Sequence, residues 1–201
     1  MINGGAALFT SVYFVRHALP NCNDHNDMTR TLTEQGLRDR KLVTDFLSDK
    51  NIDVVFSSPY KRAVDTVKEF ADINKLQIQH IDDFRERRVG SGWIDDFDGF
   101  CKKQWEDFDF SLSGGESLTA VQSRNICALN NVLKIHKGKN IAIGSHGTAL
   151  STVINYFDNS FGYDEFYEIK NLMPWIVGFT FEGKKCLEIR KYNLFENNRL
   201  I

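Results

Sequence analysis

The chain has 201 residues, of which 42% are hydrophobic and 26% charged, and its formal net charge is −2. This length suits one globular domain with a full core, and the charge offers no basic excess for nucleic acid. The four cysteines form no CxxC pair, so neither a zinc motif nor a disulfide framework is indicated. We therefore expect free thiols and a cytoplasmic protein.

Targeting and membrane segments are not indicated either. No stretch of the sequence approaches the roughly 18 apolar residues of a membrane span. The N-terminal segment MINGGAALFT has no basic residues, so we expect residues 1–10 to be a tail rather than a signal peptide. We expect one domain over residues 1–201 that has neither a membrane nor nucleic acid as a partner.

Apolar strands alternate with amphipathic helices along the chain. The pattern predicts strands at 12–16, 54–56, 76–81, 141–145, 175–181 and 185–192, the last two joined across Glu182 and Gly183. It predicts helices that begin near Thr33, at Ser58–Pro59, at Glu116, at His146 and near Asp164, with Thr33, Ser58 and Asp164 as caps. Such alternation is typical of an α/β fold, a three-layer sandwich with a mostly parallel central sheet and helices on both faces.

Segment 84–114 interrupts this alternation and reads as a loop-rich insertion over the active site. It is rich in acids and carries the aromatic residues Trp93, Phe97, Phe100, Trp105, Phe108 and Phe110. A long loop inside a compact domain is more often a lid or a binding wall than a linker. The aromatic residues at 93–110 could form a lid, a homodimer interface, or both.

Three predicted strands end in residues that a protein core does not need. The strand VYFV runs into Arg16 and His17, and the strand IAIGS runs into His146. The strand VVF ends before Ser58, and Arg62 follows four residues later. Ligands of open α/β sheets bind at the carboxyl ends of the strands. If these strands are neighbours, two arginines and two histidines converge there.

Arg62 indicates which ligand such a site would hold. It lies in the first turn of its predicted helix, where the macrodipole disfavours a cation, and Lys61 adds a second positive charge. A bound anion would relieve this conflict, and two guanidiniums beside helix N-termini suit a phosphate dianion. No carboxylate cluster has obvious metal-ligand spacing, so we expect neither a metal nor another cofactor.

Five segments, in order, resemble the motifs of a known family. VRHALPNCN, SSPYKRAVDT, FRERRVGSGW, GGESL and SHGTAL resemble the histidine phosphatase superfamily, which includes the cofactor-dependent phosphoglycerate mutases. The resemblance covers about residues 12–182 and implies a phosphoglycerate mutase-like fold. The GGES form and the short chain favour the phosphatase branch.

The resemblance also implies residue roles. His17 would be the nucleophile, and the phosphate would be bound by Arg16, Asn23, Arg62 and His146. Glu86 would protonate the leaving oxygen, with Asp82 and Asp83 as neighbouring alternatives. Substrate-binding roles at the edge of the pocket are implied for Glu116 and Ser117. Apart from the resemblance, the basic run Arg85, Arg87 and Arg88 is either a solvated run or a site for a second anionic group of the substrate. Trp93, in the aromatic insertion, is a candidate for a wall around an uncharged leaving group. Pro20 stands where the family usually has a hydroxyl, for which Asn23 or a backbone N–H would compensate.

The chemistry of these residues agrees with that reading. A neutral imidazole is a competent nucleophile near pH 7, and nearby arginines favour its neutral form. We therefore expect a metal-independent phosphomonoesterase, a phosphoric monoester hydrolase of the histidine acid phosphatase type, acting on a small phosphorylated metabolite. Two alternatives stay open: phosphoryl transfer of the phosphoglycerate mutase type, and a non-catalytic phosphate-binding module.

Overall fold

The strands of the computed structural model form a single sheet in the order β3-β2-β4-β1-β5-β6-β7. The structure describes residues 8–91, 94–196 and 199–200. The strands are β1 Phe9–Arg16, β2 Val54–Ser57, β3 Ile78–His80, β4 Asn140–Ser145, β5 Trp175–Glu182, β6 Lys185–Asn193 and β7 Arg199–Leu200. Strands β1 to β4 are parallel, and β5, β6 and β7 extend the sheet in antiparallel pairs. The predicted α/β fold is therefore confirmed.

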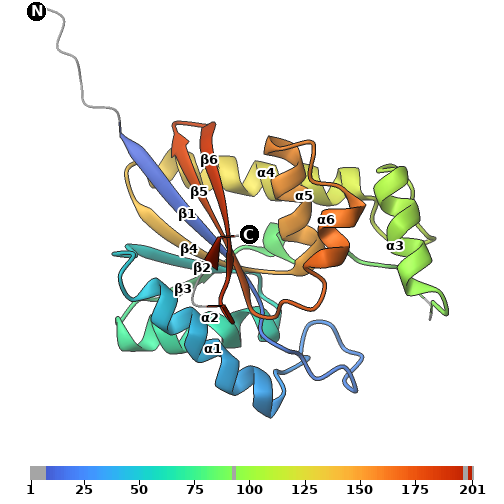
Figure 1. Ribbon diagram of the computed structural model, residues 1–201, viewed down its shortest axis with the longest axis horizontal. Coiled ribbons are helices and arrows are strands. Elements are labelled where there is room, and N and C mark those ends of the chain that lie inside the picture. Colours follow the sequence, from blue (N-terminus) through green and yellow to red (C-terminus); the bar gives the residue numbers. More distant parts are fainter. Residues whose placement is uncertain (1–7, 92–93, 197–198, 201) are drawn as a thin grey trace, which may run out of the picture.

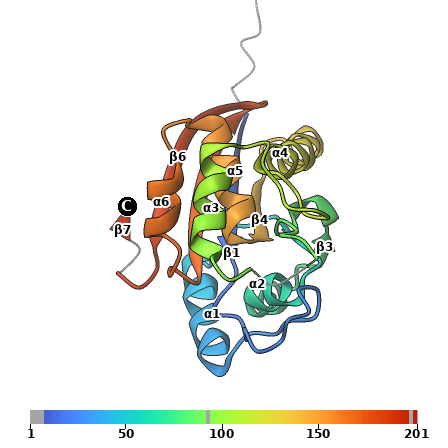
Figure 2. The same cartoon turned by 90° about the vertical axis from the view of Figure 1, so that its right-hand side faces the viewer.

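Helices cover both faces of this sheet (Figure 1). Helices α1 Glu34–Leu47 and α2 Lys61–Ile73 lie on one face, and α4 Leu118–Ile135 and α5 Gly147–Phe157 lie on the other. A short 3₁₀ turn spans Asp82–Phe84. Two further helices, α3 Phe97–Glu106 and α6 Tyr163–Glu168, lie side by side at the end of the molecule that Figure 2 brings toward the viewer.

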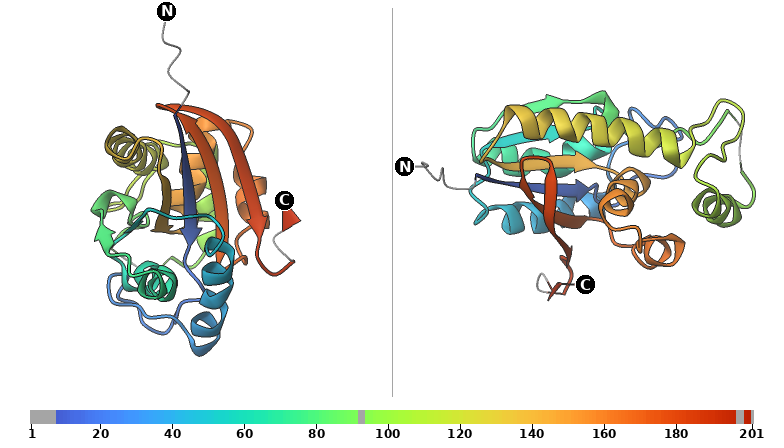
Figure 3. Two further views of the ribbon diagram at one scale, coloured as in Figure 1. Left: turned by 90° about the vertical axis from the view of Figure 1, so that its left-hand side faces the viewer. Right: turned by 90° about the horizontal axis from the view of Figure 1, so that it is seen from above.

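Strand β1 lies in the interior of the sheet, between β4 and β5 (Figure 3). A strand paired on both sides and covered on both faces can be apolar throughout, which explains its continuous apolar run. On the side of α4 and α5, the core includes Phe14, Leu129, Ile143, Val153 and Phe179. On the side of α1 and α2, it includes Val15, Val43, Phe46, Val55 and Val67. Successive β1 residues thus contribute to opposite cores.

The helices agree with the sequence prediction except near the site. Thr33 caps α1, and its Oγ1 accepts a hydrogen bond from the N–H of Gly36 at 3.0 Å. Helix α2 begins at Lys61 rather than at Pro59, and Tyr60 rather than Ser58 is its N-cap residue. The Ser58 Oγ accepts a hydrogen bond from the Tyr60 N–H at 3.2 Å and lies 2.8 Å from His146 Nε2. Helix α6 begins after Gly162 rather than after Asp164.

The segment 84–114 differs most from its prediction, because it contains helix α3. Asp96 caps this helix through a hydrogen bond from the Gly99 N–H to its Oδ1 at 2.8 Å. Phe100, Cys101 and Trp105 are buried and fall at helical spacing, but the segment around them is rich in acids and resembles a loop in sequence. At the chain start, β1 already begins at Phe9, within the predicted tail.

Candidate active site

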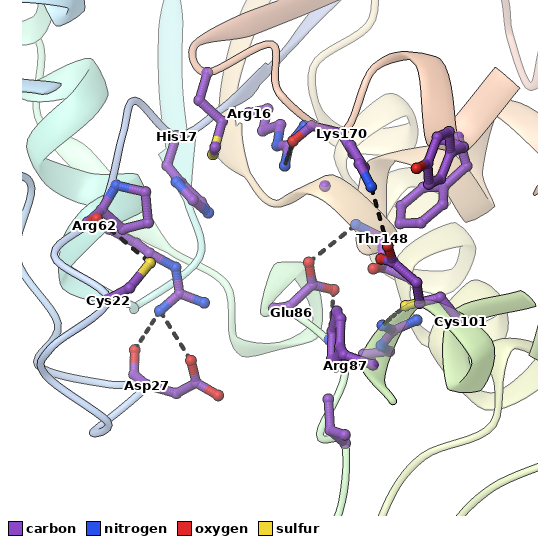
Figure 4. Close-up of a pocket in the computed structure, with 18 of the residues that line it drawn as sticks. Arg16, His17, Cys22, Asp27, Arg62, Glu86, Arg87, Cys101, Thr148 and Lys170 are labelled. Carbon is purple, nitrogen blue, oxygen red and sulfur yellow. Dashed lines mark hydrogen bonds and ion pairs between the residues drawn. The ribbon is translucent and has the colours of Figure 1, made fainter. Parts of the chain in front are cut away.

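The carboxyl ends of β1, β4 and β2 meet at one point. Arg16 of β1 is paired with Ser145 of β4, and the His17 N–H donates to the Ser145 carbonyl at 3.1 Å. The Ser58 N–H donates to the carbonyl of Gly144 at 2.8 Å, which places the end of β2 beside β4. A cavity of about 430 Å³ opens at this edge of the sheet, and its lining includes Arg16, His17, Arg62, Glu86, Arg87 and Thr148 (Figure 4).

The His17 imidazole makes a hydrogen bond through one ring nitrogen, Nδ1, and the other, Nε2, has no hydrogen-bond partner among the described residues. Its Nδ1 lies 2.8 Å from the carbonyl oxygen of Ala18, which only accepts, so Nδ1 carries the proton. The lone pair is therefore on Nε2. Burial lowers the pKa of His17 well below its ordinary value, and the charges of Arg62 and Arg16 lower it further. The ring is consequently neutral at neutral pH.

The second histidine, His146, lies beside the first. The two rings are 5.3 Å apart between centroids. His146 Nε2 lies 2.8 Å from Ser58 Oγ, whereas Nδ1 is buried with no hydrogen-bond partner among the described residues. Burial lowers the pKa of His146 well below its ordinary value, with Arg62 and His17 adding to the effect. His146 is fully buried, next to the cavity rather than in its lining.

Arg16 is fixed by the chain that follows α6. Its Nη1 donates to the Ile169 carbonyl at 2.7 Å and its Nη2 to the Lys170 carbonyl at 2.9 Å. Burial lowers the pKa of Arg16 to about 10, so the guanidinium stays charged at neutral pH, and Glu86 opposes that shift. Gly147 packs against it, since a Cβ there would lie 3.1 Å from Arg16 Cζ.

Arg62 is buried and is held by a residue that the sequence analysis did not single out. Its Nη1 donates to the Asp27 carbonyl at 2.6 Å and lies 3.3 Å from Asp27 Oδ1. Burial lowers the pKa of Arg62, and Asp27 counteracts this. Asp27 belongs to the polar segment 21–31. No motif in that segment predicts that Asp27 lies beside Arg62.

Glu86 faces His17 across the cavity (Figure 4). Its Oε2 accepts a hydrogen bond from the Thr148 N–H at 3.0 Å, and its Oε1 accepts one from the Ala149 N–H at 3.2 Å. These are backbone donors of the first turn of α5, where a carboxylate is favoured by the helix dipole. Of the two neighbouring acids that the sequence left open, neither Asp82 nor Asp83 lines the cavity.

Arg124 supports the segment that carries Glu86, and sequence reasoning missed it. Its Nη1 donates to the carbonyls of Asp83 and Arg85 at 2.6 and 2.8 Å, and its Nη2 donates to the Glu86 carbonyl at 3.2 Å. Glu116 in turn accepts from Arg124 Nε at 2.9 Å. Glu116 therefore does not line the cavity but holds the arginine that fixes the backbone around Glu86.

The remaining predicted site residues lie in different places. Ser117 caps α4, where its Oγ accepts from the Ala120 N–H at 3.2 Å, and it does not line the cavity. Asn23 is exposed and also lies outside the cavity lining. Arg87 is buried in the cavity wall. Trp93 lies outside the described residues.

Two further observations concern metals and membranes. Within residues 8–91 and 94–196, no group of three or more His, Cys, Asp or Glu side chains is placed to hold a metal ion. None of the described helices is both long enough and apolar enough to cross a bilayer.

Comparison with known sequences gives one family. The family described as histidine phosphatase superfamily (branch 1) matches residues 12–193. Phosphoserine phosphatase 1 of Hydrogenobacter thermophilus is 32% identical over 125 residues, which cover 57% of this chain and 58% of that protein. A metal-independent phosphoserine phosphatase of Arabidopsis thaliana is 27% identical over 159 residues, or 72% of this chain and 67% of that protein. The chain thus matches little more than half the length of the first relative.

Solved structures share the fold at low sequence identity. A mycobacterial glucosyl-3-phosphoglycerate phosphatase has a TM-score of 0.73 and 16% identity, covering 91% of this chain and 97% of that one. A phosphoserine phosphatase mutant of Entamoeba histolytica, in complex with phosphoserine, has a TM-score of 0.71 and 20% identity. The match covers 90% of this chain and 96% of that one.

The Glu116 network predicts a pH-dependent contribution to stability. Burial alone would raise the pKa of Glu116, but hydrogen bonds from Arg124 and from the Arg88 N–H outweigh it and lower the pKa. A lowered pKa contributes stability above the carboxyl's unfolded pKa of about 4.3, and that contribution is lost as the pH falls through the folded pKa. Glu116→Gln should therefore lower the free energy of unfolding by about 1–3 kcal/mol at pH 7 and by less in acid.

Urea denaturation between pH 7 and pH 3 measures this difference. Glu106→Gln is the matched control, because the Glu106 side chain is 64% exposed and lies 4.0 Å from Lys102. A Glu116→Gln deficit that is the same at every pH would show that the lowered pKa is not its cause.

Proposed function

The chain belongs to the histidine phosphatase superfamily, and from that membership we propose that it hydrolyses a small phosphorylated metabolite through a phosphohistidine on His17. The proposal makes it a metal-independent phosphomonoesterase of the histidine acid phosphatase type. The observation that carries it is the unprotonated Nε2 of a buried, neutral His17 in the wall of a cavity that also contains Arg16 and Arg62. The two relatives named as phosphoserine phosphatases support a small substrate. The four free cysteines support a reducing, cytoplasmic location.

In the first step, His17 Nε2 attacks phosphorus, and the bond to the ester oxygen breaks as the N–P bond forms. Charge on the phosphoryl oxygens is stabilised by the guanidiniums of Arg16 and Arg62, which favour planar oxyanions. The His146 ring packs against that of His17, with 5.3 Å between their centroids, and so helps to hold the nucleophile in place. The departing oxygen takes a proton from Glu86, which faces the nucleophile across the cavity.

In the second step, water attacks the phosphohistidine. The Glu86 carboxylate takes a proton from that water, the P–N bond breaks, and its electron pair returns to Nε2. The products are inorganic phosphate and a free enzyme with the same protonation as before. Backbone N–H groups of Thr148 and Ala149 hold the Glu86 side chain in position, as the protonated acid in the first step and as the carboxylate in the second.

Hydrolysis of p-nitrophenyl phosphate in excess EDTA tests the proposal. We expect turnover that survives EDTA and that falls by at least about 10³-fold in His17→Ala, because the nucleophile is gone. The activity should also persist below pH 6.5, since burial and the two arginines lower the pKa of His17 and keep its ring neutral there.

The other outcomes point to the alternatives. Loss of activity in EDTA, or full activity in His17→Ala, would exclude the mechanism. If the folded wild type isomerises phosphoglycerate faster than it hydrolyses phosphoesters, the protein is a mutase. If it binds phosphate tightly and turns over neither, it is a binding module.

The role of Glu86 predicts a dependence on the leaving group. A p-nitrophenolate ion departs without a proton, whereas an alkoxide needs one. Glu86→Gln should therefore reduce kcat/KM, which reports the first step, by about 10²–10⁴-fold on alkyl phosphates and much less on p-nitrophenyl phosphate. The kcat should fall on both substrates, because the second step also uses Glu86.

Steady-state kinetics of Glu86→Gln, Asp82→Asn and Asp83→Asn measure this difference. The two aspartate variants serve as controls because neither side chain lines the cavity. A leaving-group effect that appears in Asp82→Asn or Asp83→Asn, and not in Glu86→Gln, would reassign the acid.

A further inference from the structure

Arg87 is a buried cation that forms no ion pair with an acid of the described residues. Its side chain is 3% exposed, and its Nη2 donates to Cys101 Sγ at 3.0 Å. Its Nη1 is buried and has no hydrogen-bond partner in the part of the chain that the structure describes. The guanidinium carbon lies 5.2 Å from the ring centre of Phe100 and 5.5 Å from that of Phe97.

These neighbours leave the positive charge uncompensated. Aromatic faces attract a cation only modestly, and a thiol is a weak acceptor. Burial raises the pKa of the Cys101 thiol, so Cys101 supplies no negative charge at neutral pH. A buried guanidinium with unsatisfied N–H groups is costly unless an anion completes its surroundings. The missing partner is therefore expected to come from outside the chain.

Arg87 lines the same cavity as His17. Figure 4 shows the Glu86 carboxylate between the His17 and Arg62 side of the cavity and the Arg87 and Cys101 side. A phosphoester bound with its phosphorus at His17 has its leaving group directed past Glu86, since Glu86 protonates the leaving oxygen. An anion at Arg87 would therefore belong to the leaving group and not to the transferred phosphoryl group.

We propose that Arg87 determines substrate specificity by binding a carboxylate on the leaving group. This inference rests on the proposed function, because it assigns the second half of the same substrate. A carboxylate suits the position better than a second phosphate, since one arginine satisfies a carboxylate. Each other Arg or Lys of the described cavity lining is held by another group of the chain. Lys170, which also lines the cavity, is paired with Asp98 at 3.2 Å.

The two neighbouring arginines do not share this position. Arg85 is paired with Asp82 at 3.1 Å and with Glu116 at 3.0 Å. The Arg88 side chain is exposed and does not line the cavity. Arg88→Met is therefore a matched control for Arg87→Met, which removes the guanidinium but keeps an unbranched apolar stem.

Two pairs of phosphoesters that differ by one carboxylate test the proposal. They are phosphoglycolate with ethyl phosphate, and O-phosphoserine with O-phosphoethanolamine. The wild type and Arg88→Met should hydrolyse the carboxylate member of each pair with the higher kcat/KM. Arg87→Met should lose about 10- to 100-fold in kcat/KM on the carboxylate members and change little on the others. Arg87→Lys should recover part of the loss.

Equal losses on both members of a pair would overturn the proposal, because they indicate a structural role for Arg87. So would a wild type that does not distinguish the members, or one that prefers a bisphosphate to both. Circular dichroism of each variant checks that it is folded, and the ratio within one variant is independent of the fraction folded.

A binding measurement separates this proposal from the proposed function. In His17→Ala, which lacks the nucleophile, calorimetry should show tighter binding of phosphoglycolate than of ethyl phosphate. Adding Arg87→Met should abolish that difference. If the wild type turns over no phosphoester but the binding difference holds, the catalytic proposal fails and the assignment of Arg87 stands. If the difference is absent, the assignment of Arg87 fails whatever the turnover.

Discussion

The parallel pairing of β1 with β4 is the constraint on which the site depends. It places Arg16 opposite Ser145, so that His17 and His146, the next residue of each strand, are neighbours. A shift of β1 by one residue in this register would turn its side chains to the other face of the sheet and separate His17 from His146. The apolar cores on the two faces of the sheet oppose such a shift, because each β1 residue from Val12 to Val15 is packed in place.

Burial and charge act together at this edge of the sheet. The two imidazoles are buried beside two guanidiniums, and both effects lower the histidine pKa values. Few carboxylates contact these guanidiniums. Asp27 contacts Arg62, whereas the Glu86 carboxylate accepts its hydrogen bonds from backbone N–H groups of α5. A site arranged this way is suited to a phosphate dianion, which would supply the charge that the chain omits. In the same cavity, Arg87 is a second buried cation whose charge an anionic group of the ligand would balance.

Much of this could be predicted from the sequence, because strand ends and helix starts are local features. The segments around His17, Ser58, Arg62 and His146 indicated the parallel strands and their common edge. What the sequence could not give are contacts between distant segments. Asp27 returns to Arg62 from a polar loop, and Arg124 reaches three carbonyls from the middle of α4. Helix α3 has only ten residues and lies in an acid-rich segment that resembles a loop in sequence. The isolation of Arg87 is likewise a property of packing, since Arg85, Arg87 and Arg88 are indistinguishable in sequence.

The most direct test of the central claim is to trap the phosphoryl group on the enzyme. The protein would be mixed rapidly with a phosphoester and quenched in alkali, under which phosphohistidine survives, and its peptides examined by mass spectrometry. The account predicts one added phosphoryl group on the peptide that contains His17, formed and lost at rates that match turnover. A phosphoryl group on another side chain such as Ser58, or a His17 that stays unmodified throughout steady-state turnover, would contradict it.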